Sequence, residues 1–430
     1  MPRIAAPALI FVVALVVYAV SPVKVQSDSQ WSIPTVVSLL HEGNADLDEF
    51  RPTALKQPHG IVESHGHLYG GFPLGPSLAA LPLLAVFDGF VRLTVPIAAQ
   101  FPKLQTASQR WLTRFHAVGS VELTYYDTIE LIIASLFVAG AAVLVFLTGR
   151  QVTTPRAALI VTVLFTFGTG AYSTASRVLW QHSPSILAIA AVVFVLTRPQ
   201  QTWKTALAVG LLSGLAYVFR PTNALTILSC AGWFVATRRQ WLLPFALGGL
   251  AIAIPFCLYN LAVFDALLPA YYLPERLEPG DGHFGQALVG NLVSPGRGLF
   301  VYTPMLLFCF FARPRRLEWA FVAVIAAHWL TISAFPHWWG GHAFGPRLFT
   351  DVLPYFVYFL FKPVEWILAN VKQRPVWKVL LGVAAALSLF IHTRGATAIA
   401  THGWNDGPPN VDVAPQRLWD WKDLAFLRGL

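Results

Sequence analysis

The feature that most constrains this fold is a series of long apolar runs that recurs from one end of the chain to the other. Each run has roughly 15–22 residues, close to the ~20 that a helix needs to cross the hydrocarbon layer of a bilayer. The runs predict membrane-spanning helices over about 5–22, 128–148, 157–175, 185–197, 205–219, 222–237, 241–263, 299–312, 317–335, 348–368 and 377–392. We therefore expect an all-α polytopic membrane protein with about eleven transmembrane helices.

Composition supports this fold class. Hydrophobic residues make up 56% of the 430 residues and charged residues only 12%, against about 25% charged in a typical soluble domain. Such a chain lacks the polar surface needed to face water on all sides. Its three cysteines, Cys230, Cys257 and Cys309, lie inside apolar runs, which argues against a disulfide framework or a metal site. The net charge of +9 is better explained by membrane orientation than by a nucleic-acid partner.

One further apolar segment, 72–91, decides the orientation of the whole chain. It carries Pro73, Pro76, Pro82 and Asp88, and we expect it to lie along the membrane interface. With that placement, five basic loops fall on the cytoplasmic side, at Arg150/Arg156, Arg198/Lys204, Arg238/Arg239, Arg313/Arg315/Arg316 and Lys372/Arg374/Lys378. The positive-inside rule favours this arrangement. The N-terminus is then cytoplasmic, and the outer side carries a long first loop (23–127) and a C-terminal tail (393–430).

The short outer loops hold fewer cations than the inner loops. The longest of these outer loops also carries acidic residues. The cations are Arg177, Arg220, Arg276, Arg297 and Arg347, and the acidic residues are Asp265, Glu275, Glu278 and Asp281. In mid-membrane the predicted spans are nearly free of Asp, Glu, Lys and Arg, with His328 as the main ionisable exception. Because ion-coupled transporters usually need carboxylates along their pathway, this scarcity argues against transport. Polar outer loops beside apolar helices instead favour a surface cavity for a substrate with a lipid tail and a polar head.

Asp28 begins the polar part of the first loop, a few residues after the first predicted helix. One interpretation is a general base that takes a proton from an acceptor hydroxyl or amine. The other, which the local residues favour, is an ordinary cap of the next helix. Farther along the loop, His59, Glu63, His65 and His67 lack a recognised metal-ligand spacing, and a polar turn is the favoured interpretation.

Three later outer segments carry candidate binding residues. The segment RVLWQHSPS offers Arg177 and His182, SPGRGLF offers Arg297, and HWWGGHAFGPRLF offers Trp339, His342 and Arg347. A glycine-flanked arginine, or one near a helix start, suits a phosphate, and tryptophan suits a sugar ring or the headgroup layer. The alternatives are an interfacial Arg-Trp anchor, a tight turn and an aromatic belt, respectively.

The order of these segments resembles that of membrane glycosyltransferases of the C-type fold (GT-C), the class of the protein O-mannosyltransferases and aminoarabinose lipid A transferases. The resemblance rests on Asp28 after the first helix, on YGGFPLGPSLAALP (69–82) closing the first outer loop, and on WWGGHAFGPR (338–347) before a late helix. The chain is most similar to bacterial, functionally unassigned members, whose tails contain a segment like QRLWDWKDLAFLR (416–428).

The resemblance implies transfer of a sugar from a polyprenyl-phosphate carrier to a lipid, glycan or protein acceptor of the cell envelope. It implies that Asp28 is the catalytic base and that Arg347 binds the carrier phosphate. We add Arg297 to the phosphate clamp and expect Trp339, His342, Arg177 and His182 to contact substrate. Many members have a second acidic residue beside the first, whereas Ser29 follows Asp28 here, which leaves metal dependence open.

The resulting hypothesis is an integral membrane glycosyltransferase of a bacterial inner membrane, with its active site facing outward. No protein-bound metal site is expected in the sequence, although a divalent cation remains open as a cofactor. The main alternative is a flippase or transporter of a lipid-linked saccharide. A third is an enzyme like the O-antigen ligases or polymerases, for which the late outer loop at 264–298 is short.

Overall fold

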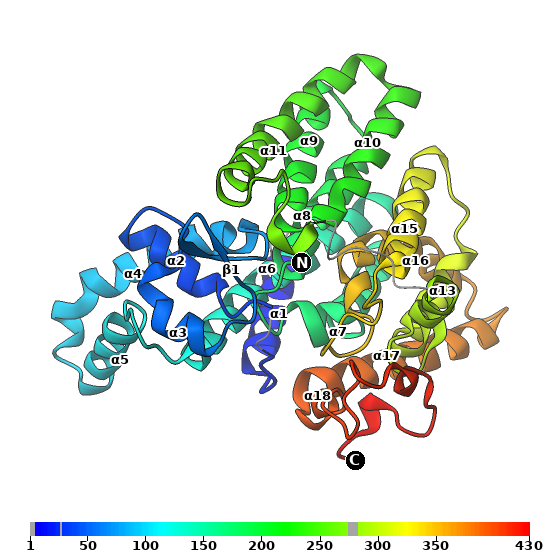
Figure 1. The fold of residues 1–430 in the computed structure, drawn as a ribbon. Coiled ribbons are helices and arrows are strands. Elements are labelled where there is room, and N and C mark those ends of the chain that lie inside the picture. Colours follow the sequence, from blue (N-terminus) through cyan, green and yellow to red (C-terminus); the bar gives the residue numbers. More distant parts are fainter. Residues whose placement is uncertain (1–4, 26–27, 274–282) are drawn as a thin grey trace.

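A computed structural model describes residues 5–25, 28–273 and 283–430, and over these residues the chain is mostly helical (Figure 1). The only strands within the described residues form one small antiparallel hairpin, β1 (Ile61–Ser64) and β2 (His67–Gly70). The predicted all-α class is thus confirmed apart from this hairpin.

The main body is a bundle of apolar helices whose largest buried cluster joins residues from many of them. In chain order the bundle contains α1 (Ala5–Val20), α6 (Asp127–Val152), α7 (Pro155–Phe167), α8 (His182–Leu196), α9 (Trp203–Phe219), α10 (Ala224–Thr237), α11 (Leu242–Phe264), α13 (Phe284–Val293), α14 (Leu299–Tyr302), α15 (Arg316–Ala334), α16 (Leu353–Ala369) and α17 (Pro375–Thr397). Capping residues and prolines in the local sequence determine where some of these helices begin. Thr154 accepts the amide of Ala157 at 3.4 Å and Pro155 occupies the first turn of α7.

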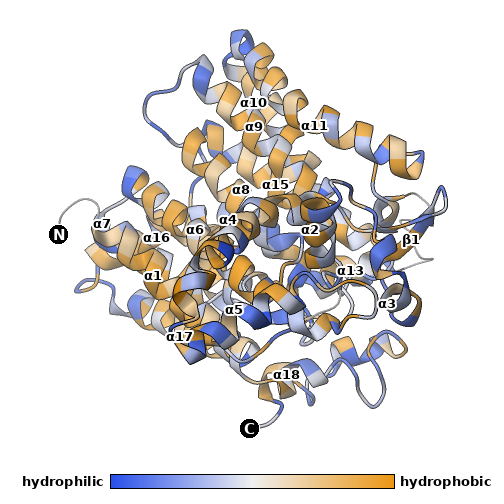
Figure 2. Cartoon of the chain, turned by 90° about the vertical axis from the view of Figure 1, so that its left-hand side faces the viewer, coloured by the Kyte–Doolittle hydropathy of each residue, from blue (hydrophilic) through white to orange (hydrophobic). Residues whose placement is uncertain are grey.

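Six of the described helical segments are long and apolar enough to cross a membrane, which is consistent with a membrane protein. They are Gly75–Ala98, Leu123–Val152, Arg239–Phe264, Arg316–Ala334, Arg347–Ala369 and Pro375–Thr397. Helices α1, α7, α8 and α9 are apolar but have only 10–17 residues. The predicted count of eleven spans is therefore not confirmed. Figure 2 shows that apolar residues dominate most helices of the bundle, and that hydrophilic residues gather toward loops and helix ends.

Two predicted spans are shorter than expected. The run at 157–175 ends as α7 at Phe167, and after Gly168 the chain forms a buried π-helical turn, η3 (Ala171–Ala175). The run at 299–312 is broken at Thr303, where α14 ends and a 3₁₀ helix, η7 (Pro304–Phe311), begins. Proline has no backbone N–H to continue a helix and disfavours the helical conformation of the residue before it, which explains the break at Pro304.

The first outer loop folds as a lobe beside the bundle, seen in blue and cyan in Figure 1. Its helices are α2 (Ser32–His41), α3 (Arg51–Lys56), α4 (Gly75–Ala98) and α5 (Pro102–Arg114). Asp88 of α4 accepts hydrogen bonds from Trp111 and His116 at 2.8 and 2.7 Å, which ties α4 to α5 and the turn after it. Gly75 lies so close to α9 that an added Cβ would stand 2.4 Å from the carbonyl oxygen of Val218.

The predicted interfacial segment 72–91 becomes the first two thirds of α4. This helix is long and apolar enough to span, and much of it is exposed, including Val86, Phe90 and Leu93. It packs mainly on α2 and α5 of the same lobe and also contacts α8 and α9 of the bundle. The interfacial placement therefore stays a prediction.

Two predicted spans carry a buried acidic residue close to one end, outside the mid-membrane part that was expected to be nearly free of charge. Glu130 in α6 and Asp351, just before α16, are both fully buried. Asp351 belongs to η8 (Arg347–Val352), the short helix that leads into α16. Glu275, Arg276, Glu278 and Asp281 of the predicted 264–298 loop lie outside the described residues.

Residues 398–430 fold back on the bundle as a compact tail. Its short helices are α18 (Ala400–Gly403), η9 (Pro415–Trp419) and η10 (Ala425–Leu427). Trp404 is buried in this tail, and the guanidinium groups of Arg297 and Arg417 lie 5.4 and 4.5 Å from its ring centre. The tail is therefore part of the fold and covers the loops that precede α14 and η8.

Candidate active site

The structure brings Asp28 and Arg347 into direct contact. An Nη1 hydrogen of Arg347 is donated to Oδ2 of Asp28 over 3.0 Å, and the other carboxylate oxygen lies 3.3 Å from Nε2 of His59. The Arg347 side chain is 10% exposed and that of Asp28 is 22% exposed, so the pair is largely shielded but Asp28 still meets solvent. A carboxylate in this position can exchange a proton with a molecule that enters from water.

The local sequence explains why Arg347 points toward Asp28. Gly345 has a φ of +63°, and a Cβ there would stand 2.6 Å from the ring of Tyr302. Only glycine fits such a turn without strain. Pro346 follows, and Arg347 then opens η8. The guanidinium lies over the Trp180 ring, 4.6 Å from its centre, and its Nε has no hydrogen-bond partner among the described residues.

The cation–π contact with Trp180 restrains the Arg347 guanidinium without using all of its donors. A planar guanidinium held this way is preorganised for two parallel hydrogen bonds to a phosphate or carboxylate. Asp28 takes one of these positions in the structure. Arg347 is therefore a suitable anion-binding group beside a candidate base.

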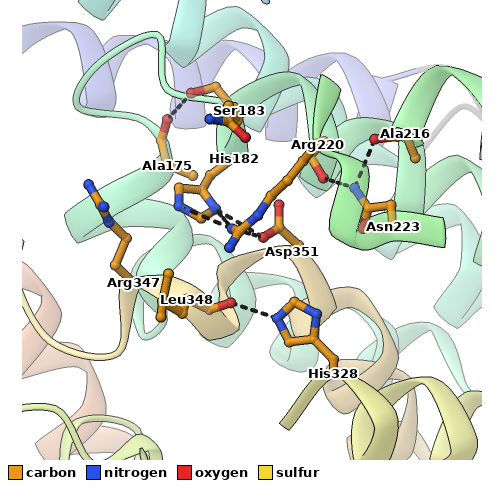
Figure 3. A network of polar contacts seen from close by, with 12 residues as sticks. Ala175, His182, Ser183, Ala216, Arg220, Asn223, His328, Arg347, Leu348 and Asp351 are labelled. Carbon is orange, nitrogen blue, oxygen red and sulfur yellow. Dashed lines mark hydrogen bonds and ion pairs between the residues drawn. The ribbon is translucent and has the colours of Figure 1, made fainter. Parts of the chain in front are cut away.

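A second, buried set of charged groups lies beside Arg347 (Figure 3). Oδ2 of Asp351 accepts hydrogen bonds from Arg220 and from Nδ1 of His182, the latter over 3.0 Å. Arg220 and His182 are also in contact with each other. In Figure 3 the Arg347 side chain lies beside this network and points away from it. Through Asp351, which belongs to η8, the network holds this turn in place.

His328, the ionisable residue expected inside a span, also supports this turn. Its Nε2 donates to the carbonyl oxygen of Leu348 over 2.8 Å, one residue after Arg347 (Figure 3). His328 is 1% exposed. Its contacts are those of a residue that positions η8.

Asp28 and Arg347 line a small cavity of about 40 Å³, together with Trp180, His182 and Arg220. Asp28 also lines a neighbouring cavity of about 30 Å³ next to Trp31 and Tyr259. Each is about the size of one water molecule, so a sugar phosphate needs more room than they offer. The rings of Phe72 and Tyr271 both line the first cavity and face each other at 4.6 Å.

Arg297 does not line the Asp28 cavity, and its hydrogen-bond donors are already used. Its guanidinium donates to the carbonyl oxygens of Trp339, Gly296 and Gly341 at 2.7–2.9 Å and to the side-chain oxygen of Asn405. It is 1% exposed, and burial lowers its pKa to about 10, which leaves it charged at neutral pH. The expectation that Arg297 shares a phosphate clamp with Arg347 is not met, because this side chain holds the tail to the preceding loops.

The remaining predicted substrate-binding residues also have structural partners. Arg177 is buried, donates to the carbonyl oxygen of Tyr18 over 2.8 Å and lies 5.5 Å from the Tyr172 ring centre. The Trp339 indole donates to Asp412 over 2.7 Å, and His342 lies 3.2 Å from Asp406. Of the seven predicted residues, the structure therefore gathers Asp28, His182 and Arg347 at one cavity and leaves Arg177, Arg297, Trp339 and His342 outside its lining.

The described residues around Asp28 do not form a three-ligand metal site. The groups with metal-like spacing are Asp46/Asp48/His67 and Glu42/Asp46/Glu49, in the first-loop lobe. In the first group, Asp48 already accepts hydrogen bonds from Arg51 and His67. Burial disfavours ionisation of Asp48, but these bonds and the Leu68 amide outweigh it and hold the pKa of Asp48 below its ordinary value. Asp28 is itself paired with Arg347. The described residues at the Asp28 cavity therefore fit a divalent cation poorly.

Asp351 and Arg220 are the residues that the sequence interpretation missed. Asp351 falls inside the predicted span 348–368, and a carboxylate within an apolar run needs a cation partner. Arg220 was available as an outer-loop cation at the end of a predicted helix. These two facts together could have predicted the pair.

The sequence matches no protein-family model and no curated protein. The arrangement of side chains therefore carries the functional argument.

Proposed function

We propose that this protein is an integral membrane glycosyltransferase that moves a sugar from a polyprenyl-phosphate carrier to an acceptor. The observation that carries the proposal is the Asp28–Arg347 pair: a partly exposed carboxylate 3.0 Å from a guanidinium that is stacked on Trp180. Sugar transfer from a phosphate carrier needs one group that removes a proton and one that stabilises a phosphate leaving group. This pair supplies both within a single contact.

In the proposed reaction, an acceptor hydroxyl or amine attacks the anomeric carbon of the donor sugar. A new bond forms between the acceptor heteroatom and that carbon, and the bond from the carbon to the phosphate oxygen breaks. Asp28 takes the acceptor proton, and the polyprenyl phosphate leaves with the bonding electron pair. Arg347 donates hydrogen bonds to the phosphate oxygens, where negative charge accumulates. Attack from the face opposite the phosphate inverts the anomeric centre.

Donor binding has to enlarge the cavity in this proposal. Phe72 and Tyr271 are the rings that line it and face each other, so their separation would make room for the sugar. A phosphate on Arg347 would also replace the Asp28 carboxylate at one guanidinium edge and free that oxygen to act as base.

The proposed cellular setting is a bacterial inner membrane, with the N-terminus in the cytoplasm and Asp28 on the outer side. The basic loops, among them those at Arg238/Arg239 and Arg313/Arg315/Arg316, support this orientation. The proposed partners are the lipid-linked donor, an envelope acceptor and the surrounding lipid.

The alternative is a flippase of a lipid-linked saccharide. Buried Glu130 and Asp351 are the kind of carboxylate that a transport pathway needs. Both, however, lie near the same end of the bundle as Asp28. Glu130 accepts the amide of Leu179, which lines the Asp28 cavity, and Asp351 precedes α16 by two residues. The enzyme is therefore the preferred proposal.

The test is transfer by the purified protein in nanodiscs from a panel of radiolabelled polyprenyl-phosphate sugars, with extracted envelope lipids as acceptors. Asp28→Asn should reduce turnover by about 10²–10⁴-fold, the usual contribution of a positioned base. Asp420→Asn, in the exposed part of the tail, is the matched control and should keep full activity. Full activity of Asp28→Asn would refute the base assignment, and movement of the donor across the bilayer without a covalent product would favour the flippase.

A further inference from the structure

A spacious cavity lies at the opposite end of the bundle from Asp28. It has a volume of about 1200 Å³ and is lined by the last residues of α6 and α16, including Val152 and Ala369. The other ends of these helices adjoin the Asp28 site, through Glu130 in α6 and Asp351 before α16. The 17 residues of α16 span about 25 Å at 1.5 Å per residue. The cavity and the candidate active site are therefore separated by roughly the thickness of a membrane core.

The break at Thr303 explains why this cavity exists. The eight residues of η7 rise about 16 Å at 2 Å per residue, well short of the ~30 Å hydrocarbon core. The neighbouring α16 and α17 have 17 and 23 residues. The chain leaves η7 at Phe311 and turns into the Arg313–Arg315 loop, so that space remains between η7, α15, α16 and α17.

The cavity wall is apolar and aromatic. Phe308, Phe311, Phe359 and Phe361 line it, and the Trp377 ring meets Phe311 edge-on at 4.9 Å between centres. Phe311 and its neighbour Phe310 are 55% and 72% exposed, so the wall continues onto the outer surface of the bundle. An apolar surface that opens sideways from a membrane helix bundle suits an acyl chain.

The rim of the cavity is cationic. Arg313, Arg315, Lys362 and Arg374 line it, against two carboxylates, Glu318 and Glu365. Glu365 is paired with Lys362 at 2.8 Å, and Glu318 accepts hydrogen bonds from the Tyr358 hydroxyl and the Arg315 amide. Arg374 is stacked on Trp366 at 5.5 Å. Within the described residues, no carboxylate lies within ion-pair distance of Arg313, Arg315 or Arg374. The rim therefore has a surplus of positive charge.

We propose that this cavity binds an anionic glycerophospholipid. Its phosphodiester would lie among Arg313, Arg315 and Arg374, with one acyl chain against Phe311 and Trp377. Basic pockets between membrane helices favour anionic headgroups, and tryptophan favours the depth of the headgroup layer. The sugar donor is a poorer occupant, because its reacting phosphate belongs about 25 Å away beside Arg347. This proposal does not depend on the chemistry at Asp28.

The experiment measures lipid retention and thermal stability of the purified full chain. The protein is placed in nanodiscs of phosphatidylcholine with rising fractions of phosphatidylglycerol, and bound lipid is counted by native mass spectrometry. We expect selective retention of phosphatidylglycerol and a higher melting temperature in its presence. The double variant Arg313→Gln/Arg315→Gln should weaken retention of phosphatidylglycerol by roughly 10- to 30-fold, because each arginine that is removed contributes its own attraction to the anionic headgroup.

Arg238→Gln/Arg239→Gln is the matched control, since it removes two exposed arginines outside the cavity lining. It should leave retention unchanged. Equal retention of phosphatidylcholine and phosphatidylglycerol would overturn the proposal, as would full retention by the Arg313/Arg315 variant. Inorganic phosphate that reproduces the stabilisation in zwitterionic nanodiscs would reassign the rim to a free anion and overturn the lipid proposal.

Discussion

The carboxylate of Asp28 and the guanidinium of Arg347 are 319 residues apart in the sequence and 3.0 Å apart in space. Arg347 lies in the turn before α16, whereas Asp28 lies between α1 and α2. The contact therefore joins the beginning of the chain to a late loop. Any change that moves η8 will move Arg347 away from Asp28.

Replacing Arg347 should weaken binding of a lipid-phosphate donor without unfolding the protein. Arg347→Gln should raise the donor KM by roughly 10- to 100-fold, because a hydrogen bond to a charged group contributes about 1.5–3 kcal/mol, and should also lower kcat, because the leaving phosphate gains charge in the transition state. Arg297→Gln is the informative contrast. Its side chain holds the tail rather than the cavity, so its main effect should be a lower melting temperature. An unchanged KM in Arg347→Gln would contradict the phosphate role.

Replacing Asp351 should destabilise the fold. Asp351→Asn leaves the buried Arg220 charge without its carboxylate, a change that typically costs about 3–5 kcal/mol. The double variant Arg220→Gln/Asp351→Asn should recover part of the loss, since no unpaired charge then remains. Melting temperatures of the two single variants and the double variant in one detergent provide the measurement. Additive losses would show that the two side chains do not act as a pair.

Topology reporters inserted into loops can show on which side of the membrane the chain lies after α4. A reporter inserted after Gln100, between α4 and α5, should read as outside, and one inserted after Lys372, between α16 and α17, as inside. The reversed pattern, inside after Gln100 and outside after Lys372, would mean that α4 crosses the membrane, and every later loop would then change side.

The β-hairpin should loosen in acid. The pKa of Asp48 is held below its ordinary value of 3.8, so Asp48 stabilises the hairpin above that value, and its contribution is lost as pH falls through the lower, folded pKa. The Leu68 amide donates to Asp48 over 3.1 Å and reports the change directly. Hydrogen exchange of a peptide covering 61–70, corrected for intrinsic rates, should accelerate below about pH 4. Asp48→Asn should remove this acid dependence, and a persistent dependence would assign it to another group.

The sequence was most informative about helices, because the length and spacing of apolar runs report directly on burial in lipid. Boundaries of α6, α11 and α15 lie within about four residues of the predicted ones. The broken helix at Thr303 was missed because its residues remain apolar throughout, and only Pro304 signals the change of geometry.

The site was harder to predict than the helices. The resemblance to the GT-C enzymes suggested roles for Asp28 and Arg347, whereas the contacts of Arg297 and Asp351 depend on distant segments of the chain. Arg297 looks like a phosphate ligand in SPGRGLF, yet carbonyl groups from 42 and 44 residues away occupy its donors. Asp351 looks like part of an apolar run until Arg220, 131 residues away, packs against it.

The carbonyl groups around Arg297 also determine how the tail responds to ionic strength. Dissolved ions screen exposed ion pairs over about 8–10 Å at physiological salt, but they do not enter a site that is 1% exposed. Dissolved anions therefore cannot compete with the carbonyl dipoles that surround this buried guanidinium. The tail should therefore stay docked on the preceding loops at salt concentrations that strip peripheral proteins from the same membrane. Exposed ion pairs such as Arg51–Asp48 should weaken under the same conditions.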